Sequence, residues 1–188
     1  MKFHINRKEA LSAARKAAQA APENSPIAEL TGVLVEADEN TGQVSFFVAD
    51  LKIAIRCEVQ ADVEAGGAAI INAQLLTGML SLTNGDRVSV ESLKNGLLRL
   101  KCRDTEYTVG TLKPDILTSV KIPVPDTLVR LTGLPSLERS TTFAAAKKSE
   151  QQQMECVRLE IAPNSVQAAA CDGARLIETR EKAESGGS

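Results

Sequence analysis

Short segments in which apolar and polar residues alternate recur along most of this chain. Alternation with a period of two predicts half-buried strands. These strands are expected at about residues 2–6, 32–37, 44–49, 53–59, 68–71, 87–92, 97–102, 107–112, 119–123, 156–161 and 165–171. Turn sequences such as Asp38–Gly42 and Asn95-Gly96 separate neighbouring strands. Antiparallel hairpins are therefore expected.

Three other segments have helical spacing. Residues 8–21 place small apolar side chains on one side, while the opposite side carries Lys8, Ser12, Arg15 and Gln19. A second helix is expected over 73–82, with Asn72 as its N-cap. A third helical region begins near Asp126, is interrupted by Pro135 and resumes as far as Lys148.

The order strand, helix and further strands recurs, which indicates a repeated unit. The stretch that ends in Asp50 resembles the stretch that ends in Asp172, because both are apolar hairpins followed by a small residue and an aspartate. The spacing indicates a duplicated domain of about 120 residues, within the usual size range. The alternative is that two hairpins resemble each other by chance. The domains are expected at 1–118 and 119–188, with the second one cut short.

Composition places the chain among globular proteins, because 43% of its 188 residues are apolar and 24% are charged, with a net charge of −2. Neither a membrane-spanning run nor the apolar core of a signal peptide is present, so the cytoplasm is the expected compartment and no membrane is expected as a partner. The four cysteines contain no C-x-x-C pair, which disfavours zinc. They are interpreted as free buried thiols in or beside strands.

The residues needed for catalysis are missing from the sequence. His4 is the only histidine, and it lies in a strand-like run. Neither a glycine-rich phosphate loop nor a zinc-protease motif is found. Acid–base catalysis by Asp50 or Asp172 is a weak alternative, since neither has a histidine or nucleophile nearby in the sequence. The chain is therefore expected to be a binding or scaffold protein rather than an enzyme, and no cofactor or metal is expected.

Five stretches, taken in order, resemble one known family, the beta subunit of bacterial DNA polymerase III. They are Met1–Phe3, Ala49–Ile53, Leu93–Leu100, Thr108–Leu112 and Cys171–Leu176. The last is similar to the family's A-T-D-G-H-R-L signature and is the most specific. The resemblance implies an α+β DNA clamp fold, in which repeated strand-helix-strands units place helices on one face of antiparallel sheets. It also implies a sliding clamp, a processivity factor that encircles duplex DNA and tethers the replicative polymerase.

The resemblance also implies three sets of functional residues. DNA of any sequence would face basic side chains of the helices: Lys8, Arg15, Arg130, Arg139, Lys147 and Lys148. Short peptide motifs of polymerase and clamp-loader subunits would bind a pocket that includes Met154, Cys171, Gly173, Ala174, Arg175 and Leu176. Half of the seam of a homodimeric ring, formed by the full-length parent, would contain Leu82, Tyr107 and Val109.

Two departures from the family pattern keep a second function open. Ala174 stands where the family signature has histidine, and the loop Pro22–Pro26 lacks the family's arginine. The chain also corresponds to one domain and about half of the next. The alternative is therefore a clamp-fold adaptor, or a fragment outside any ring, that binds protein motifs without encircling DNA.

Overall fold

The structure is a computed structural model that describes residues 1–22, 24–50, 53–120, 134–162 and 164–182. Two compact units, Met1–Pro123 and Val124–Ser188, divide the chain and are treated separately. Among the described residues, no helix combines the length and the apolar character needed to cross a membrane.

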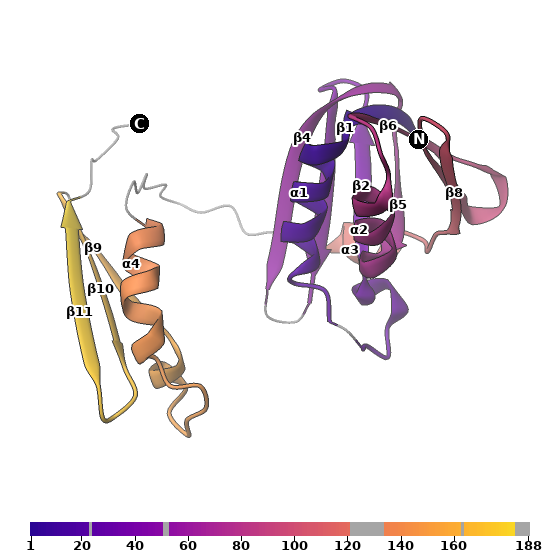
Figure 1. Cartoon of the computed structure of the whole chain (residues 1–188). Helices are drawn as coiled ribbons and strands as arrows, with labels where there is room; N and C mark the ends of the chain where they lie inside the picture. Colours follow the sequence, from indigo (N-terminus) through magenta and orange to yellow (C-terminus); the bar gives the residue numbers. More distant parts are fainter. Residues whose placement is uncertain (23, 51–52, 121–133, 163, 183–188) are drawn as a thin grey trace. The chain divides into compact units, whose positions relative to one another are not determined.

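The first unit is built on one eight-stranded sheet with the order β5-β2-β3-β4-β1-β6-β7-β8 (Figure 1). All of its strand pairs are antiparallel. The strands are β1 Lys2–Asn6, β2 Gly32–Asp38, β3 Gln43–Ala49, β4 Ala54–Ala65, β5 Gly67–Asn72, β6 Arg87–Ser92, β7 Leu97–Cys102 and β8 Thr105–Gly110. β4 extends six residues beyond its predicted end because it pairs with β3 first and with β1 afterwards.

Helices α1 (Arg7–Ala18) and α2 (Ala73–Leu82) lie side by side against one face of this sheet (Figure 1). The apolar side of α1 is formed by small residues, so the helix lies close to the strands. Each helix follows a strand that ends in asparagine. Asn6 Oδ1 accepts hydrogen bonds from the Lys8 and Glu9 amides, and Asn72 Oδ1 accepts them from the Gln74 and Leu75 amides. Asn72 is thus confirmed as an N-cap, and Asn6 is a second cap of the same kind.

The opposite face of the first unit has a smaller core that sequence reasoning missed. A short helix, α3 (Asp115–Ser119), places Leu117 in a buried cluster with Phe47 and Ile70. The strand predicted from Ser119 is wrong at its first residue, because Ser119 ends this helix; residues 121–123 lie outside the described part. Leu117 and Val120 pack on the first unit, which explains why that unit extends past residue 118.

The second unit contains a three-stranded antiparallel sheet in the order β11-β10-β9 and one helix. Its strands are β9 Arg158–Ala162, β10 Ser165–Cys171 and β11 Leu176–Lys182, and helix α4 spans Leu134–Thr141. Alternate residues of β10 are buried, and two of them, Val166 and Ala168, form a cluster with Leu137 of α4. Pro135 lies in the first turn of α4, where proline is tolerated. The part of the predicted helix from Asp126 to residue 133 lies outside the described residues, so the interruption at Pro135 stays a prediction.

The predicted continuation of α4 to Lys148 is wrong, because the helix ends at Thr141. Thr141 and Thr142 bond their hydroxyls back to the carbonyls of Leu137 and Glu138, which gives the chain an alternative to further helical turns. A short 3-10 segment, Thr142–Ala144, follows, and the backbone is extended at Ala145. Lys147 and Lys148 therefore lie in a loop instead of on a helix.

The two aspartates of the sequence repeat occupy matching turns. The Asp50 amide donates to the Ile53 carbonyl, and the Asp172 amide donates to the Arg175 carbonyl. In both turns the aspartate carboxylate accepts the amide hydrogen three residues later. Each turn also follows the second strand of an antiparallel hairpin, β2–β3 or β9–β10. Matching hydrogen bonds at both places favour the duplication over chance resemblance.

Candidate nucleic-acid and partner interfaces

The exposed side of α1 carries a short row of cations. Lys8 and Arg15 are exposed and seven residues apart, which is about two helical turns. Lys16 is also exposed beside Arg15, and sequence reasoning missed it. The position of Lys16 next to Arg15 on a predicted amphipathic helix could have indicated that it belongs to this row. The three side chains present positive charge on the layer of helices, away from the sheet.

Polar, uncharged side chains of α2 continue this surface. A shallow hollow of about 390 Å³ is lined by Arg15 and Gln19 of the first helical segment and by Gln74, Thr77 and Ser81 of α2. The α2 residues were not predicted as site residues, although their spacing of three and four residues places them on one side of a helix. Because α2 contains no lysine or arginine, α1 supplies the positive charge of this face.

Arg7 fixes the position of α2 relative to the start of α1. Its Nε donates to the Gly85 carbonyl at 2.7 Å, and its Nη1 donates to the Leu80 carbonyl at 3.1 Å. Leu80 lies in the last turn of α2, where carbonyls have no partner within the helix. A cation at this end also interacts favourably with the helix dipole. Arg7 is therefore a positioning residue, and its charge is directed to the end of α2.

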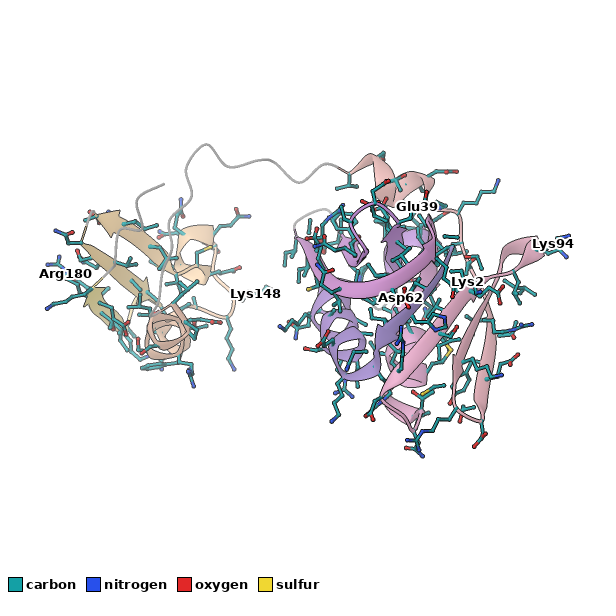
Figure 2. All side chains as sticks on the ribbon, turned by 90° about the horizontal axis from the view of Figure 1, so that it is seen from above. Lys2, Glu39, Asp62, Lys94, Lys148 and Arg180 are labelled. Carbon is teal, nitrogen blue, oxygen red and sulfur yellow. The ribbon has the colours of Figure 1, made fainter. Side chains whose placement is uncertain are left out.

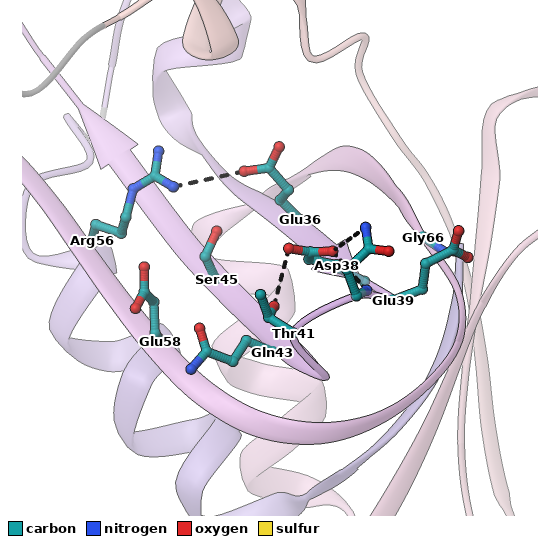
Figure 3. Close-up of a pocket in the computed structure, with 11 residues that line it drawn as sticks. Glu36, Asp38, Glu39, Thr41, Gln43, Ser45, Arg56, Glu58 and Gly66 are labelled. Carbon is teal, nitrogen blue, oxygen red and sulfur yellow. Dashed lines mark hydrogen bonds and ion pairs between the residues drawn. The ribbon is translucent and has the colours of Figure 1, made fainter.

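The sheet face that is turned away from the helices has the opposite electrostatic character near the β2–β3 turn. A hollow of about 480 Å³ lies there. Figure 3 shows several carboxylates around it. The acidic residues of its lining are Glu36, Asp38, Glu39 and Glu58. Hydrogen bonds from the Asn40 amide and the Thr41 hydroxyl lower the pKa of Asp38, so this group stays ionised. Arg56, in the same lining, pairs with Glu36 at 3.7 Å and offsets part of this charge. The remaining carboxylates disfavour a phosphate backbone, so the cationic helix face is the better candidate for a DNA surface.

The cations predicted in the second unit occupy two kinds of position. Arg139 is exposed on α4 and donates through Nε to the Pro135 carbonyl. Lys147 and Lys148 are exposed in the loop that follows α4, and Lys148 is labelled in Figure 2. Arg130 lies outside the described residues. The described cations of the second unit therefore do not form a single row on one helix.

Five of the six predicted peptide-binding residues, all except Met154, lie in or beside the turn at the end of β10. Met154 belongs to a 3-10 segment, Gln152–Glu155, and is half-buried, as is Cys171. Gly173 has φ = 89°, a left-handed conformation that favours glycine. Gly173, Ala174, Arg175 and Leu176 are exposed, and Leu176 retains 70% of its surface. An exposed leucine beside a rigid turn is suited to an apolar contact with a partner.

Asp172 organises this turn. Its carboxylate accepts hydrogen bonds from the amides of Ala174 and Arg175 and from two nitrogens of the Arg175 guanidinium, the shortest at 2.6 Å. The Arg175 side chain is the main cause, followed by the backbone amides, of a pKa for Asp172 lowered from 3.8 to about 2. The Arg175 guanidinium is therefore held against its own turn by a charge-assisted pair.

The substitution Asp172→Asn is expected to lower the thermal stability of the second unit at neutral pH. Because the folded pKa is depressed, the carboxylate contributes stability above the unfolded pKa of 3.8, and this contribution disappears as pH falls toward about 2. Circular-dichroism melts should show a lower midpoint for the variant at pH 6 and converging midpoints between about pH 4 and pH 2. Glu178→Gln, at an exposed position of β11, is the control. A difference that persists at pH 2 would contradict this role.

The residues predicted for an oligomer seam lie on two elements of the first unit, β8 and α2. β8 is the last strand of the eight-stranded sheet, so one of its edges has no neighbouring strand among the described residues. Tyr107 and Val109 of β8 are half-buried against the main core. Leu82 is the last residue of α2 and is 73% exposed. A strand edge without a neighbour favours association with another strand, and an exposed leucine favours an apolar contact.

A sheet built from two strand-helix-strands halves, with two helices on one face and a second unit that repeats the first hairpin, defines the DNA clamp class of α+β proteins. The family model of the DNA polymerase III beta subunit, N-terminal domain, matches residues 1–116. The chain therefore belongs to the DNA polymerase III beta subunit family. Within the described part of the chain, no group of three or more His, Cys, Asp or Glu residues is arranged to hold a metal.

Similar proteins with curated names support this membership. The beta sliding clamp of Micrococcus luteus is 27% identical over 177 residues, which are 94% of this chain and 56% of the relative. The beta sliding clamp of Synechococcus elongatus is 28% identical over 156 residues, which are 81% of this chain and 41% of the relative. The chain thus spans about half the length of the curated relatives that it matches.

Solved structures confirm the fold. The DNA polymerase III subunit beta from Pseudomonas aeruginosa matches with a TM-score of 0.86 and 21% identity, over 100% of this chain and 51% of that one. The beta subunit from Thermotoga maritima matches with a TM-score of 0.85 and 21% identity, over 98% of this chain and 50% of that one. The predicted α+β clamp fold is therefore confirmed.

Proposed function

We propose that this chain works as part of a sliding clamp, a non-enzymatic ring that encircles duplex DNA in the cytoplasm and tethers the replicative polymerase. The observation that carries the proposal is the pair of helices, α1 and α2, side by side on one face of a continuous eight-stranded sheet, with the exposed cations Lys8, Arg15 and Lys16 on the outer side of α1. Family membership and the names of the relatives support it.

DNA would lie along the helix face and interact with Lys8, Arg15 and Lys16. These flexible cations interact with phosphates and provide no base-specific readout, so binding should be independent of sequence and sensitive to salt. Gln74, Thr77 and Ser81 would line the same surface without adding charge. Weak contacts of this kind suit a ring that slides, because its retention depends on encirclement rather than on affinity. In the second unit, Arg139, Lys147 and Lys148 are proposed to add to the DNA-facing surface.

Partner proteins would dock on the second unit through short peptide motifs. The surface around Met154, Cys171 and Leu176 offers apolar contact, and the backbone of the Asp172–Arg175 turn offers fixed polar groups. Polymerase and clamp-loader subunits are the proposed partners. We assign the free edge of β8, together with Leu82, to the seam of a homodimeric ring in the full-length parent. The first unit would be a whole clamp domain and the second about half of one.

The test of this function is primer extension on a circular template by the cognate polymerase and clamp loader, with and without the full-length gene product. The expected result is much longer products per binding event when the protein is present, and protein that stays on circular DNA until the circle is linearised. Unchanged product length would overturn the proposal. Binding of partner peptides without retention on circular DNA would instead support an adaptor. Native mass by light scattering, over a range of concentrations, distinguishes a closed oligomer from a monomer.

A further inference from the structure

The register of the second sheet aligns two cysteines that are distant in the sequence. β9 and β10 pair from Ser165 opposite Ala162 to Ala169 opposite Arg158. Continuing this register by two residues sets Cys171 opposite Cys156. Directly opposed residues of antiparallel strands have Cα atoms about 4.5–5.5 Å apart. Disulfides form when this separation is about 4.4–6.8 Å, so two cysteines that continue the register beyond Arg158 and Ala169 would meet the distance requirement.

The side chains around Cys156 support this continuation. Val157 packs against the cluster of Leu137, Val166 and Ala168, which places it on the helix side of the sheet. Cys156 precedes it in extended conformation, with φ = −115° and ψ = 157°, so it points to the other side. Cys171 follows the buried Ala170 in β10 and points away from the helix as well. Both thiols are therefore placed on the same face of neighbouring segments.

Both cysteines are free thiols in the structure and accessible to a reagent. Cys156 is exposed and Cys171 is half-buried. Their sulfur atoms make only weak local contacts: Cys156 Sγ with the Gln152 carbonyl at 3.6 Å, and Cys171 Sγ as acceptor of the Gly173 amide at 3.2 Å. Rotation about χ1 of each side chain would exchange these contacts for a sulfur–sulfur bond.

The other two cysteines form a natural internal control. Cys57 lies in β4 and Cys102 in β7, and the strands β1 and β6 separate them in the sheet. Cys102 is also buried. Cys57 lies opposite Phe46 and Cys102 lies opposite Thr105, so neither has a cysteine opposite it in its strand pair. Ready oxidation is therefore expected for the pair Cys156 and Cys171 and not for Cys57 or Cys102.

We infer that Cys156 and Cys171 form a reversible cross-strand disulfide, a redox modification site next to the Asp172–Arg175 turn. The oxidant is a low-molecular-weight disulfide of the glutathione class. The exposed Cys156 thiolate attacks one of its sulfurs, forms a mixed disulfide and releases one small thiol. The Cys171 thiolate then attacks the Cys156 sulfur and releases the second. Two protein thiols are oxidised, one small disulfide is reduced, and the protons of the cysteines pass to the two leaving thiolates.

The bond would change the turn that follows β10. Once Cys171 Sγ is bonded to Cys156, it is drawn away from the Gly173 amide, and the 3-10 segment that carries Met154 is tied to the end of β10. Met154, Cys171 and Gly173 belong to the proposed peptide surface, so an effect on partner binding rests on the proposed function. The formation of the disulfide does not rest on the proposed function, because its chemistry is measured without any partner.

The experiment uses the purified chain, equilibrated with mixtures of oxidised and reduced glutathione and then alkylated in denaturant. The expected result is loss of two of the four thiols and a tryptic map in which peptides 149–158 and 159–175 are joined. The folded chain should be half oxidised at a ratio of oxidised to reduced glutathione about tenfold lower, or lower still, than the chain in urea. The reason is that the fold holds the two thiols close together.

Matched variants separate this pair from general thiol oxidation. Cys156→Ser and Cys171→Ser should each abolish the joined peptide, and serine keeps a hydrogen-bond acceptor for the Gly173 amide. Cys57→Ser and Cys102→Ser should leave it intact. Cross-links through Cys57 or Cys102, disulfides between two chains, or equal oxidation of the folded and urea-unfolded chain would each overturn the inference.

Discussion

Replacing Lys8, Arg15 and Lys16 with glutamine is expected to weaken the binding of duplex DNA by roughly two orders of magnitude or more at 0.1 M salt. Each phosphate contact contributes a slope of about 0.9 in a plot of log K against log salt, which is roughly a factor of eight in affinity at that salt concentration. The slope should therefore fall by about 2.7 when three contacts are lost. Fluorescence anisotropy with a short labelled duplex, titrated at several salt concentrations, measures both quantities.

A variant with the same loss of charge on other surfaces is the control. Arg87, Lys94 and Lys101 are exposed cations of the first unit outside α1. Lys94 lies in the turn between β6 and β7, at the far end of that hairpin in Figure 2. Replacing these three by glutamine should change the affinity only slightly and leave the salt slope unchanged, because phosphates are expected on the helix face. Equal losses in both variants would mean that net charge, and not the α1 row, attracts DNA.

Truncating Leu117 to alanine is expected to lower the free energy of unfolding of the first unit by about 2–5 kcal/mol. The side chain is fully buried with Phe47 and Ile70, on the sheet face that α1 and α2 leave uncovered, so its removal leaves a cavity. Urea unfolding followed by tyrosine fluorescence measures this loss. The chain has one tyrosine and no tryptophan, and Tyr107 lies in β8, so the signal reports the first unit.

The neighbouring residue provides a close control for this prediction. Ile116 belongs to the same short helix, α3, but is 40% exposed. Ile116→Ala should cost much less, within about 1 kcal/mol, because most of the cavity term is absent. The dependence of unfolding free energy on urea should be unchanged in both variants. If both substitutions cost the same small amount, α3 does not anchor the chain to the sheet as the structure indicates.

Local sequence patterns were sufficient for much of the fold. Alternation of apolar and polar residues located the strands of both hairpins, and the spacing of small apolar residues located α1, because burial on one face imposes a period of 2 or 3.6. One error came where a long-range contact outweighed the local pattern, and another where local side-chain hydrogen bonds did. α3 forms at a stretch expected to be a boundary because Leu117 fills a gap on the sheet, and α4 ends before Lys147 because its threonines bond back to the helix.

The candidate site shows the same division. Lys8 and Arg15 were predicted from the amphipathic pattern of their own helix, whereas Gln74, Thr77 and Ser81 join that surface only because α2 packs beside α1. Asp172 and Gly173 were read from a local turn motif, and their hydrogen bonds agree with that reading. The motif did not reveal that Arg175 is held by Asp172, since that pair depends on the backbone conformation of the turn.

By itself, the sequence determined the class of fold, the family and the cationic side of α1, because each is encoded by residues a few positions apart or by motifs in a fixed order. Tertiary structure alone decided the order of strands in the eight-stranded sheet, the helix–helix surface, the acidic hollow on the opposite face, and the register of β9 against β10. All of these depend on register and packing between segments distant in the chain, and a shift of one residue in register would turn every side chain of a strand to the other face.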